Sequence, residues 1–101
     1  MKKEIIKFDI EEKNEFFILN FEIVGGVLEV SDLKYISPPS PLKFAGKGVV
    51  LSGKGPVWLY SFLTHFYHPT KFIAVYDPRL NAAVITVSHD KKHQVGDLIK
   101  I

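Results

Sequence analysis

The sequence predicts a single small α/β domain, and three observations support this class. The chain has 101 residues, of which 47% are hydrophobic and 13% aromatic, so it can build one core but not two. An apolar strand, a helical stretch and a second apolar strand follow one another in residues 48–76, which is the order of a βαβ unit. Alternating segments flank this unit. We therefore expect residues 1–101 to form an N-terminal β-hairpin, a βαβ unit and antiparallel C-terminal strands.

The N-terminal half contains the predicted hairpin and an irregular connection. Apolar and polar residues alternate in residues 5–10, and a charged turn at 11–14 precedes a β-branched and aromatic run at 16–24. A serine and an aspartate can cap a short helical turn over 31–36. The Pro- and Ser-rich residues 37–41 exclude both a helix and an interior strand. They are too few to separate two domains, so we expect a surface crossing.

The second half carries the strongest pattern. A glycine-rich turn at residues 52–55 separates a short strand from a helix that starts near Pro56 and ends before Pro69. Apolar residues at helical spacing predict the buried side of this helix: Leu59, Phe62, Leu63 and Phe66. The strands predicted in this half are residues 48–51, 71–76, 82–87 and 98–101.

Charge and cysteine content exclude several classes of function. Thirteen basic against eleven acidic residues give a net charge of +2, too small for a protein that coats duplex DNA, so we expect no DNA partner. The absence of cysteine excludes thiol catalysis and Cys-ligated metals, and it favours a reducing compartment. No signal-type or membrane-spanning apolar stretch is present. We expect a soluble, cytoplasmic protein without a membrane partner.

Two loops predict an anion site at the carboxyl ends of the parallel strands. Ser52, Gly53, Lys54 and Gly55 combine flexible backbone, a helix N-terminus and a positive charge. Asp77-Pro78-Arg79 follows the next parallel strand and contains the chain's one arginine, which can grip phosphate with two hydrogen bonds. Each feature alone is also typical of an ordinary turn with solvated charges. Their convergence at one edge favours a phosphate ligand.

The histidines predict a second site at the opposite edge. His65 and His68 lie three residues apart on the accessible side of the predicted helix. The twelve steps from Pro56 to His68 span about 18 Å, which places His68 away from the anion loops. His89 ends an antiparallel strand at the same edge and could join His65 and His68 around a metal, although solvated surface histidines are the simpler alternative. His93 has no assigned role.

These placements predict an active site shared between subunits. Acid–base or metal chemistry lies at one edge and anion binding at the other, so one molecule alone is incomplete. If both serve one reaction, subunits must stack head to tail. The histidines of one subunit would then meet Asp77 and Arg79 of another.

Three linked motifs resemble a known family: SGKGPVWLY at residues 52–60, HFYHPTK at 65–71 and AVYDPRL at 74–80. Over residues 48–89 the chain resembles the small stand-alone CRISPR-associated ring nucleases of type III systems. The resemblance implies a distant, minimal relative of Rossmann-like sensor domains that binds and cleaves cyclic tetra-adenylate, a second messenger, and so switches off antiviral signalling. It implies homodimers that sandwich the ligand as a tetramer, with catalysis by His68, Asp77 and Arg79.

The same resemblance leaves two alternatives. Family members are also described as manganese-dependent nucleases, so Mn²⁺ is a candidate cofactor and single-stranded RNA a candidate substrate. In an exonuclease, bases would stack on Trp58, Tyr60 and Tyr67. A non-catalytic module that only binds cyclic oligoadenylates is the other alternative.

Overall fold

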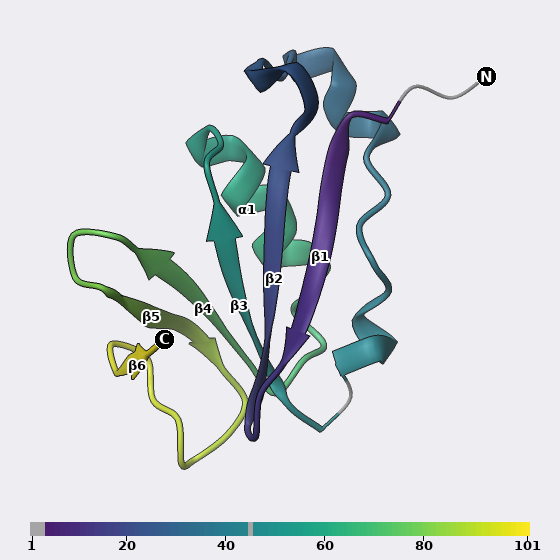
Figure 1. The fold of residues 1–101 in the computed structure, drawn as a ribbon. Coiled ribbons are helices and arrows are strands. Elements are labelled where there is room, and N and C mark those ends of the chain that lie inside the picture. The colour runs from purple at the N-terminus through teal and green to yellow at the C-terminus, as the bar shows by residue number, and fades with distance from the viewer. Residues whose placement is uncertain (1–3, 45) are drawn as a thin grey trace.

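The computed structural model describes residues 4–44 and 46–101. Within these residues one mixed sheet of six strands has the spatial order β1-β2-β3-β4-β5-β6, and a single α-helix covers one of its faces (Figure 1). The strands are β1 Ile6–Glu12, β2 Phe16–Ile23, β3 Gly48–Gly53, β4 Phe72–Asp77, β5 Ala82–Ser88 and β6 Leu98–Lys100. The helix is α1 Val57–Phe66, and the 3₁₀ turns are η1 Val24–Gly26, η2 Val30–Tyr35 and η3 Pro41–Phe44.

The strand directions confirm the predicted hairpin, βαβ unit and antiparallel C-terminal strands. β1 pairs antiparallel with β2, while β3, α1 and β4 form the βαβ unit. β5 and β6 each pair antiparallel with the strand before them in the sheet. The sequence did not predict that β2 also pairs in parallel with β3, from Phe16 opposite Gly48 to Phe21 opposite Gly53. Three parallel strands, β2, β3 and β4, therefore end at one edge of the sheet.

The connection from β2 to β3 descends beside β1, and its described residues form three 3₁₀ turns and irregular segments (Figure 1). The predicted helical turn over residues 31–36 is present as η2 Val30–Tyr35, one residue earlier and in 3₁₀ form. The Asp32 side chain accepts a hydrogen bond from the Glu29 backbone at 3.0 Å, which caps this turn. Residues 36–40 have no regular structure, as the prolines predicted.

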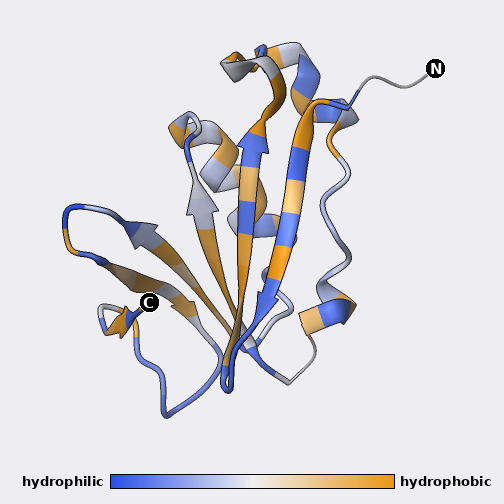
Figure 2. Ribbon diagram, viewed as in Figure 1, coloured by the Kyte–Doolittle hydropathy of each residue, from blue (hydrophilic) through white to orange (hydrophobic). Residues whose placement is uncertain are grey.

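The main core lies between the sheet and α1. Leu59 and Leu63 are fully buried, as predicted, and pack with Leu19, Leu51 and Ile73 from the three parallel strands. Figure 2 shows hydrophobic residues on α1 and in the middle of the sheet, and alternating hydrophobic and hydrophilic residues along the outer strand β1. No helix in the described part of the chain is long and apolar enough to cross a membrane.

A second apolar cluster lies on the other face of the sheet. Its buried members come from four neighbouring strands, and they are Ile18, Val50, Phe72, Ala74, Ala83 and Ile85. Phe72 occupies the space left by the missing side chain of Gly48, because a Cβ at position 48 would lie 2.3 Å from the Phe72 ring. Position 48 must therefore be glycine for Phe72 to reach its buried position.

Tyr67 joins the helix to the β2–β3 connection. It is fully buried, and its hydroxyl donates to the Pro39 carbonyl at 2.8 Å, which links residues 28 positions apart. Tyr67→Phe should lower the free energy of unfolding by about 1–2 kcal/mol, because the partly buried Pro39 carbonyl loses its partner. Urea denaturation measures this loss. Tyr35→Phe is the control, since Tyr35 is 68% exposed and should cost under about 0.5 kcal/mol. Equal effects would contradict the assignment.

Candidate functional site

The glycine-rich segment at the carboxyl edge is shaped by packing. Ser52 and Gly53 belong to β3, which extends two residues beyond the predicted strand. A Cβ at Gly53 would lie 2.4 Å from the Phe21 carbonyl oxygen, and one at Gly55 would lie 2.9 Å from Leu59. Gly53 is therefore required for close contact between β2 and β3, and Gly55 allows the close approach of Leu59 from α1. The glycine pattern had predicted a phosphate ligand. Packing explains the two glycines without one.

Ser52 and Lys54 lie on different sides of the sheet at this edge. Ser52 lines a small cavity on the face opposite α1, together with Asn20 and Tyr76. Lys54 is exposed just before α1, which begins after Pro56 with no side-chain cap. Lys54 therefore presents a positive charge near unpaired backbone N–H groups at the helix N-terminus. Of the predicted loop residues, Lys54 has the placement best suited to an anion.

Asp77 and Arg79 form one unit at the same edge. Asp77 ends β4, and its Oδ1 accepts from the Arg79 backbone N–H at 2.9 Å and from Arg79 Nε at 3.3 Å. Its Oδ2 accepts from Nη2 at 3.0 Å. The side-chain hydrogen bond is the main cause that lowers the pKa of Asp77 and raises the pKa of Arg79. Nη1 takes no part in this pair and the Arg79 side chain is 88% exposed, so an oriented cation faces outward.

His68 lies in a turn at the other end of β4, which corrects the predicted helix boundary. The helix ends at Phe66, with Tyr67 as its C-cap, so His65 lies on α1 and His68 follows it. His89 follows β5, and its backbone N–H donates to the Lys71 carbonyl at 2.9 Å. Its ring Nε2 lies 3.1 Å from the His68 carbonyl oxygen, and the two imidazole rings are 4.7 Å apart. His68 and His89 therefore form an exposed pair.

The predicted metal trio of His65, His68 and His89 is not assembled. Among residues 4–44 and 46–101, no three His, Asp or Glu side chains lie close enough together to hold a metal ion. His65 lies on α1, whereas His68 lies in the turn that follows it and pairs with His89, so His65 is outside this pair. One described chain thus supplies two neighbouring imidazoles and not a complete set of ligands.

The two groups of candidate residues lie at opposite edges of the sheet. His68 precedes β4 and Asp77 ends it, and the five steps from Phe72 to Asp77 span about 17 Å. This separation agrees with the expectation from the sequence. One chain therefore cannot bring His68 to the Asp77–Arg79 pair.

The aromatic residues suggested for base stacking are mostly unsuited to it. Tyr67 is fully buried, which contradicts that role. The Tyr60 hydroxyl donates to the Gly53 carbonyl, and its ring contacts Phe21 edge to face. Trp58 is partly buried against the main core. These side chains serve packing, so they do not form an open stacking surface.

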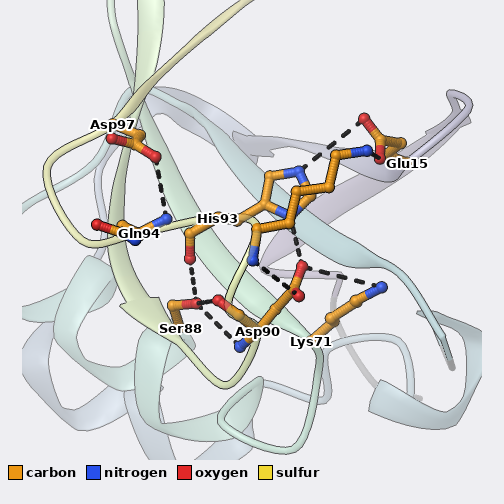
Figure 3. Close-up of polar contacts among 8 residues, drawn as sticks. Glu15, Lys71, Ser88, Asp90, His93, Gln94 and Asp97 are labelled. Carbon is orange, nitrogen blue, oxygen red and sulfur yellow. Dashed lines mark hydrogen bonds and ion pairs between the residues drawn. The ribbon is translucent and has the colours of Figure 1, made fainter.

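The structure also reveals a polar cluster that the sequence did not predict. It joins the β1–β2 turn, the start of β4 and the β5–β6 loop, and it contains Glu15, Lys71, Ser88, Asp90, Lys92 and His93 (Figure 3). His93 had no assigned role in the sequence. The spacing of Asp90 and His93, three residues apart just after His89, is the one local signal that could have indicated the cluster.

The fold and these groups define a small α/β protein with polar and charged groups at both ends of its parallel strands. Residues 22–100 match the model of the CRISPR-associated protein family Cas_csx3, and the chain belongs to this family. A protein of Aquifex aeolicus (strain VF5) named only as uncharacterized is 46% identical over 100 residues, which cover 96% of this chain and 89% of that protein. The chain is thus related to CRISPR systems.

Proposed function

We propose that this protein is a ring nuclease, a cyclic oligoadenylate phosphodiesterase that binds and cleaves cyclic tetra-adenylate. Its role would be to switch off type III CRISPR antiviral signalling in the cytoplasm, as a distant relative of Rossmann-like sensor domains. Membership of a CRISPR-associated family supports the biological setting. The observation that carries the proposal is the placement of a histidine suited to proton transfer and an oriented arginine at opposite edges of one subunit.

The chemistry requires no nucleophile from the protein. The ribose 2′-oxygen attacks the adjacent phosphorus, the bond to the 5′-oxygen breaks, and the products end in a 2′,3′-cyclic phosphate and a 5′-hydroxyl. His68 can take the proton from the 2′-hydroxyl or give one to the 5′-oxygen near neutral pH. Arg79 Nη1 and Lys54 suit the negative charge that develops on the phosphoryl oxygens. Asp77 orients Arg79 through its hydrogen bonds.

Stacked homodimers would complete this site. If the carboxyl edge of one dimer faces the histidine edge of another, Asp77 and Arg79 from one contact the ring together with His68 from the other. A two-fold dimer also suits a four-fold cyclic ligand, because equivalent patches can grip opposite phosphates. We therefore propose that two dimers form a tetramer around the ring.

Manganese fits this chain only in part. His68 and His89 are suitable nitrogen donors, but the described residues of one chain bring no third donor to them. The residues do not make a manganese site by themselves, and the proposed proton transfer and charge stabilisation rest on side chains alone. If Mn²⁺ participates, further donors must come from another subunit or from the ligand.

Chromatography of cyclic tetra-adenylate after incubation with the protein tests the proposal. We expect linear products, in parallel reactions with Mn²⁺ and with a chelator. An intact ring that co-elutes with the protein would instead indicate a binding module. Digestion of linear single-stranded RNA from a free end, with the ring untouched, would indicate an exonuclease.

Arg79→Ala should weaken ring binding by about 1.5–3 kcal/mol, the contribution of hydrogen bonds to a charged group. Titration calorimetry in a His68→Ala background, which prevents turnover, measures this change. Lys7→Ala is the control, because Lys7 is an exposed cation on the outer strand β1. Unchanged affinity of the Arg79 variant, or an equal loss for both variants, would remove Arg79 from the ligand site.

A further inference from the structure

The β5–β6 loop closes around the hydroxyl of Ser88, the last residue of β5 (Figure 3). The Ser88 oxygen accepts from the Asp90 backbone N–H at 3.1 Å. Its own hydrogen faces the carbonyl oxygens of Asp90, at 2.8 Å, and of His93. These bonds fix the backbone on both sides of His89, which lies between Ser88 and Asp90.

Asp90 and His93 form a largely buried pair inside this loop. His93 Nδ1 lies 2.5 Å from Asp90 Oδ2, and each side chain is only 14% exposed. Asp90 Oδ1 also accepts from the Lys92 backbone N–H at 3.2 Å. The hydrogen bond with His93 is the main cause that lowers the pKa of Asp90. The loop is therefore held by a specific side-chain bond as well as by its backbone.

His93 fastens the loop to the sheet. Its ring stacks on Phe72, with ring centres 4.3 Å apart and an interplanar angle of 26°. Phe72 is fully buried and is held in the space at Gly48. The Asp90–His93 pair therefore rests on a rigid part of the core. Glu15 and Lys92 add an outer ion pair at 2.5 Å, which is more exposed and should contribute little.

The neighbour of this pair, His89, contacts the turn that carries His68. The His89 backbone N–H donates to the Lys71 carbonyl, and its ring contacts the His68 carbonyl and lies beside the His68 ring. We infer that Asp90 and His93 are positioning residues that hold His89 against His68 and so limit the orientations of the His68 imidazole. An exposed imidazole transfers protons best from a fixed orientation, so this contact would support catalysis by His68. That catalytic role rests on the proposed function.

Asp90→Asn, with Asp97→Asn as its matched control, tests the inference. Asp97 lies in the same loop, and its carboxylate accepts only from the Gln94 backbone among the contacts in the described part of the chain. The four histidines of the protein give four Cε1–H signals in an NMR spectrum, which substitution of each histidine assigns. Asp90→Asn should shift the signals of His93, His89 and His68 and leave that of His65. Asp97→Asn should leave the His68 signal in place.

Kinetics supply a second readout. Asp90→Asn should lower kcat for ring cleavage about 10- to 100-fold while KM stays within about twofold, since it disturbs orientation and not ligand contact. An unmoved His68 signal in Asp90→Asn, or equal shifts in Asp97→Asn, would overturn the inference. If wild-type protein fails to cleave the ring although Asp90→Asn moves the His68 signal, the proposed function fails while the positioning contact stands.

Two substitutions of His93 separate its hydrogen bond from its stacking, and they apply even if Asp90→Asn does not fold. His93→Asn keeps an N–H donor near the position of Nδ1 but loses the ring on Phe72. His93→Phe keeps the stacked ring but cannot donate to Asp90. We expect both variants to shift the His68 signal, because the hydrogen bond to Asp90 and the stacking on Phe72 both hold the loop. Retention of the His68 signal in both variants would contradict the inference.

Discussion

His68→Ala is expected to abolish cleavage of cyclic tetra-adenylate while ring binding stays within about tenfold of wild type. The imidazole transfers protons in the proposed reaction, whereas Arg79 and Lys54 at the other edge bind the phosphates. His68 is exposed in the turn after α1, so its loss should change the free energy of unfolding by less than about 0.5 kcal/mol. Chromatography of the products, calorimetry with the intact ring and urea denaturation measure the three quantities.

The opposite pattern would refute the role of His68. If the variant loses ring binding but turns over whatever still binds at the normal rate, His68 is a ligand-binding residue and not a proton-transfer residue. His65→Ala provides a comparison at the same edge, because His65 lies on α1 outside the His68–His89 pair. Retained cleavage in His65→Ala would show that the loss of cleavage in His68→Ala is specific to His68. Equal loss of cleavage in both variants would contradict a specific role for His68.

Local sequence patterns were sufficient for the elements but not for all of their partners. The hairpin and the βαβ unit follow from alternation, helical spacing and turn residues, which act over a few positions. The parallel pairing of β2 with β3 depends on a connection of more than twenty residues whose described part forms no α-helix, so no local pattern indicates the pairing. The buried position of Tyr67 was not predicted for a similar reason, because the partner of its hydroxyl, Pro39, is 28 positions away.

The candidate site was predicted in outline and corrected in detail. Helical spacing predicted a helix as far as His68, but the helix ends at Phe66, and His68 lies in the following turn, where it pairs with His89. Gly53 and Gly55 had predicted a phosphate loop, yet packing requires Gly53 beside the Phe21 carbonyl and favours Gly55 beside Leu59. The Asp90–His93 pair was not predicted, because the spacing of the two residues is only a weak local signal and their anchor, Phe72, belongs to another strand, β4. Long-range packing thus decides what local patterns leave open.

The separation of His68 from Asp77 and Arg79 predicts that activity depends on assembly. At protein concentrations below the dissociation constant of the stacked dimers, the cleavage rate per subunit should fall steeply on dilution, because fewer composite sites form. A large excess of ring should inhibit, since each dimer then holds its own ligand. Kinetics over a range of protein and ring concentrations measure both effects. A rate per subunit that does not change on dilution would show that each dimer is complete.

Mixing two inactive variants should restore cleavage. A His68→Ala dimer still supplies Asp77 and Arg79, and an Asp77→Ala dimer still supplies His68. The site is therefore complete where the carboxyl edge of a His68→Ala dimer faces the histidine edge of an Asp77→Ala dimer. With random stacking of equal amounts, about a quarter of the contacts are complete, and the recovered rate should approach that fraction of wild type. Product formation in the mixture, compared with each variant alone, measures the recovery.

A double variant provides the matched control for this mixture. Protein carrying both His68→Ala and Asp77→Ala, mixed with the His68→Ala variant, contains no His68 and should stay inactive at every ratio. Recovery in the first mixture and not in this one would require His68 and Asp77 to act from different subunits, as their positions at the two ends of β4 predict. No recovery in either mixture would place both residues in one dimer and contradict the head-to-tail arrangement.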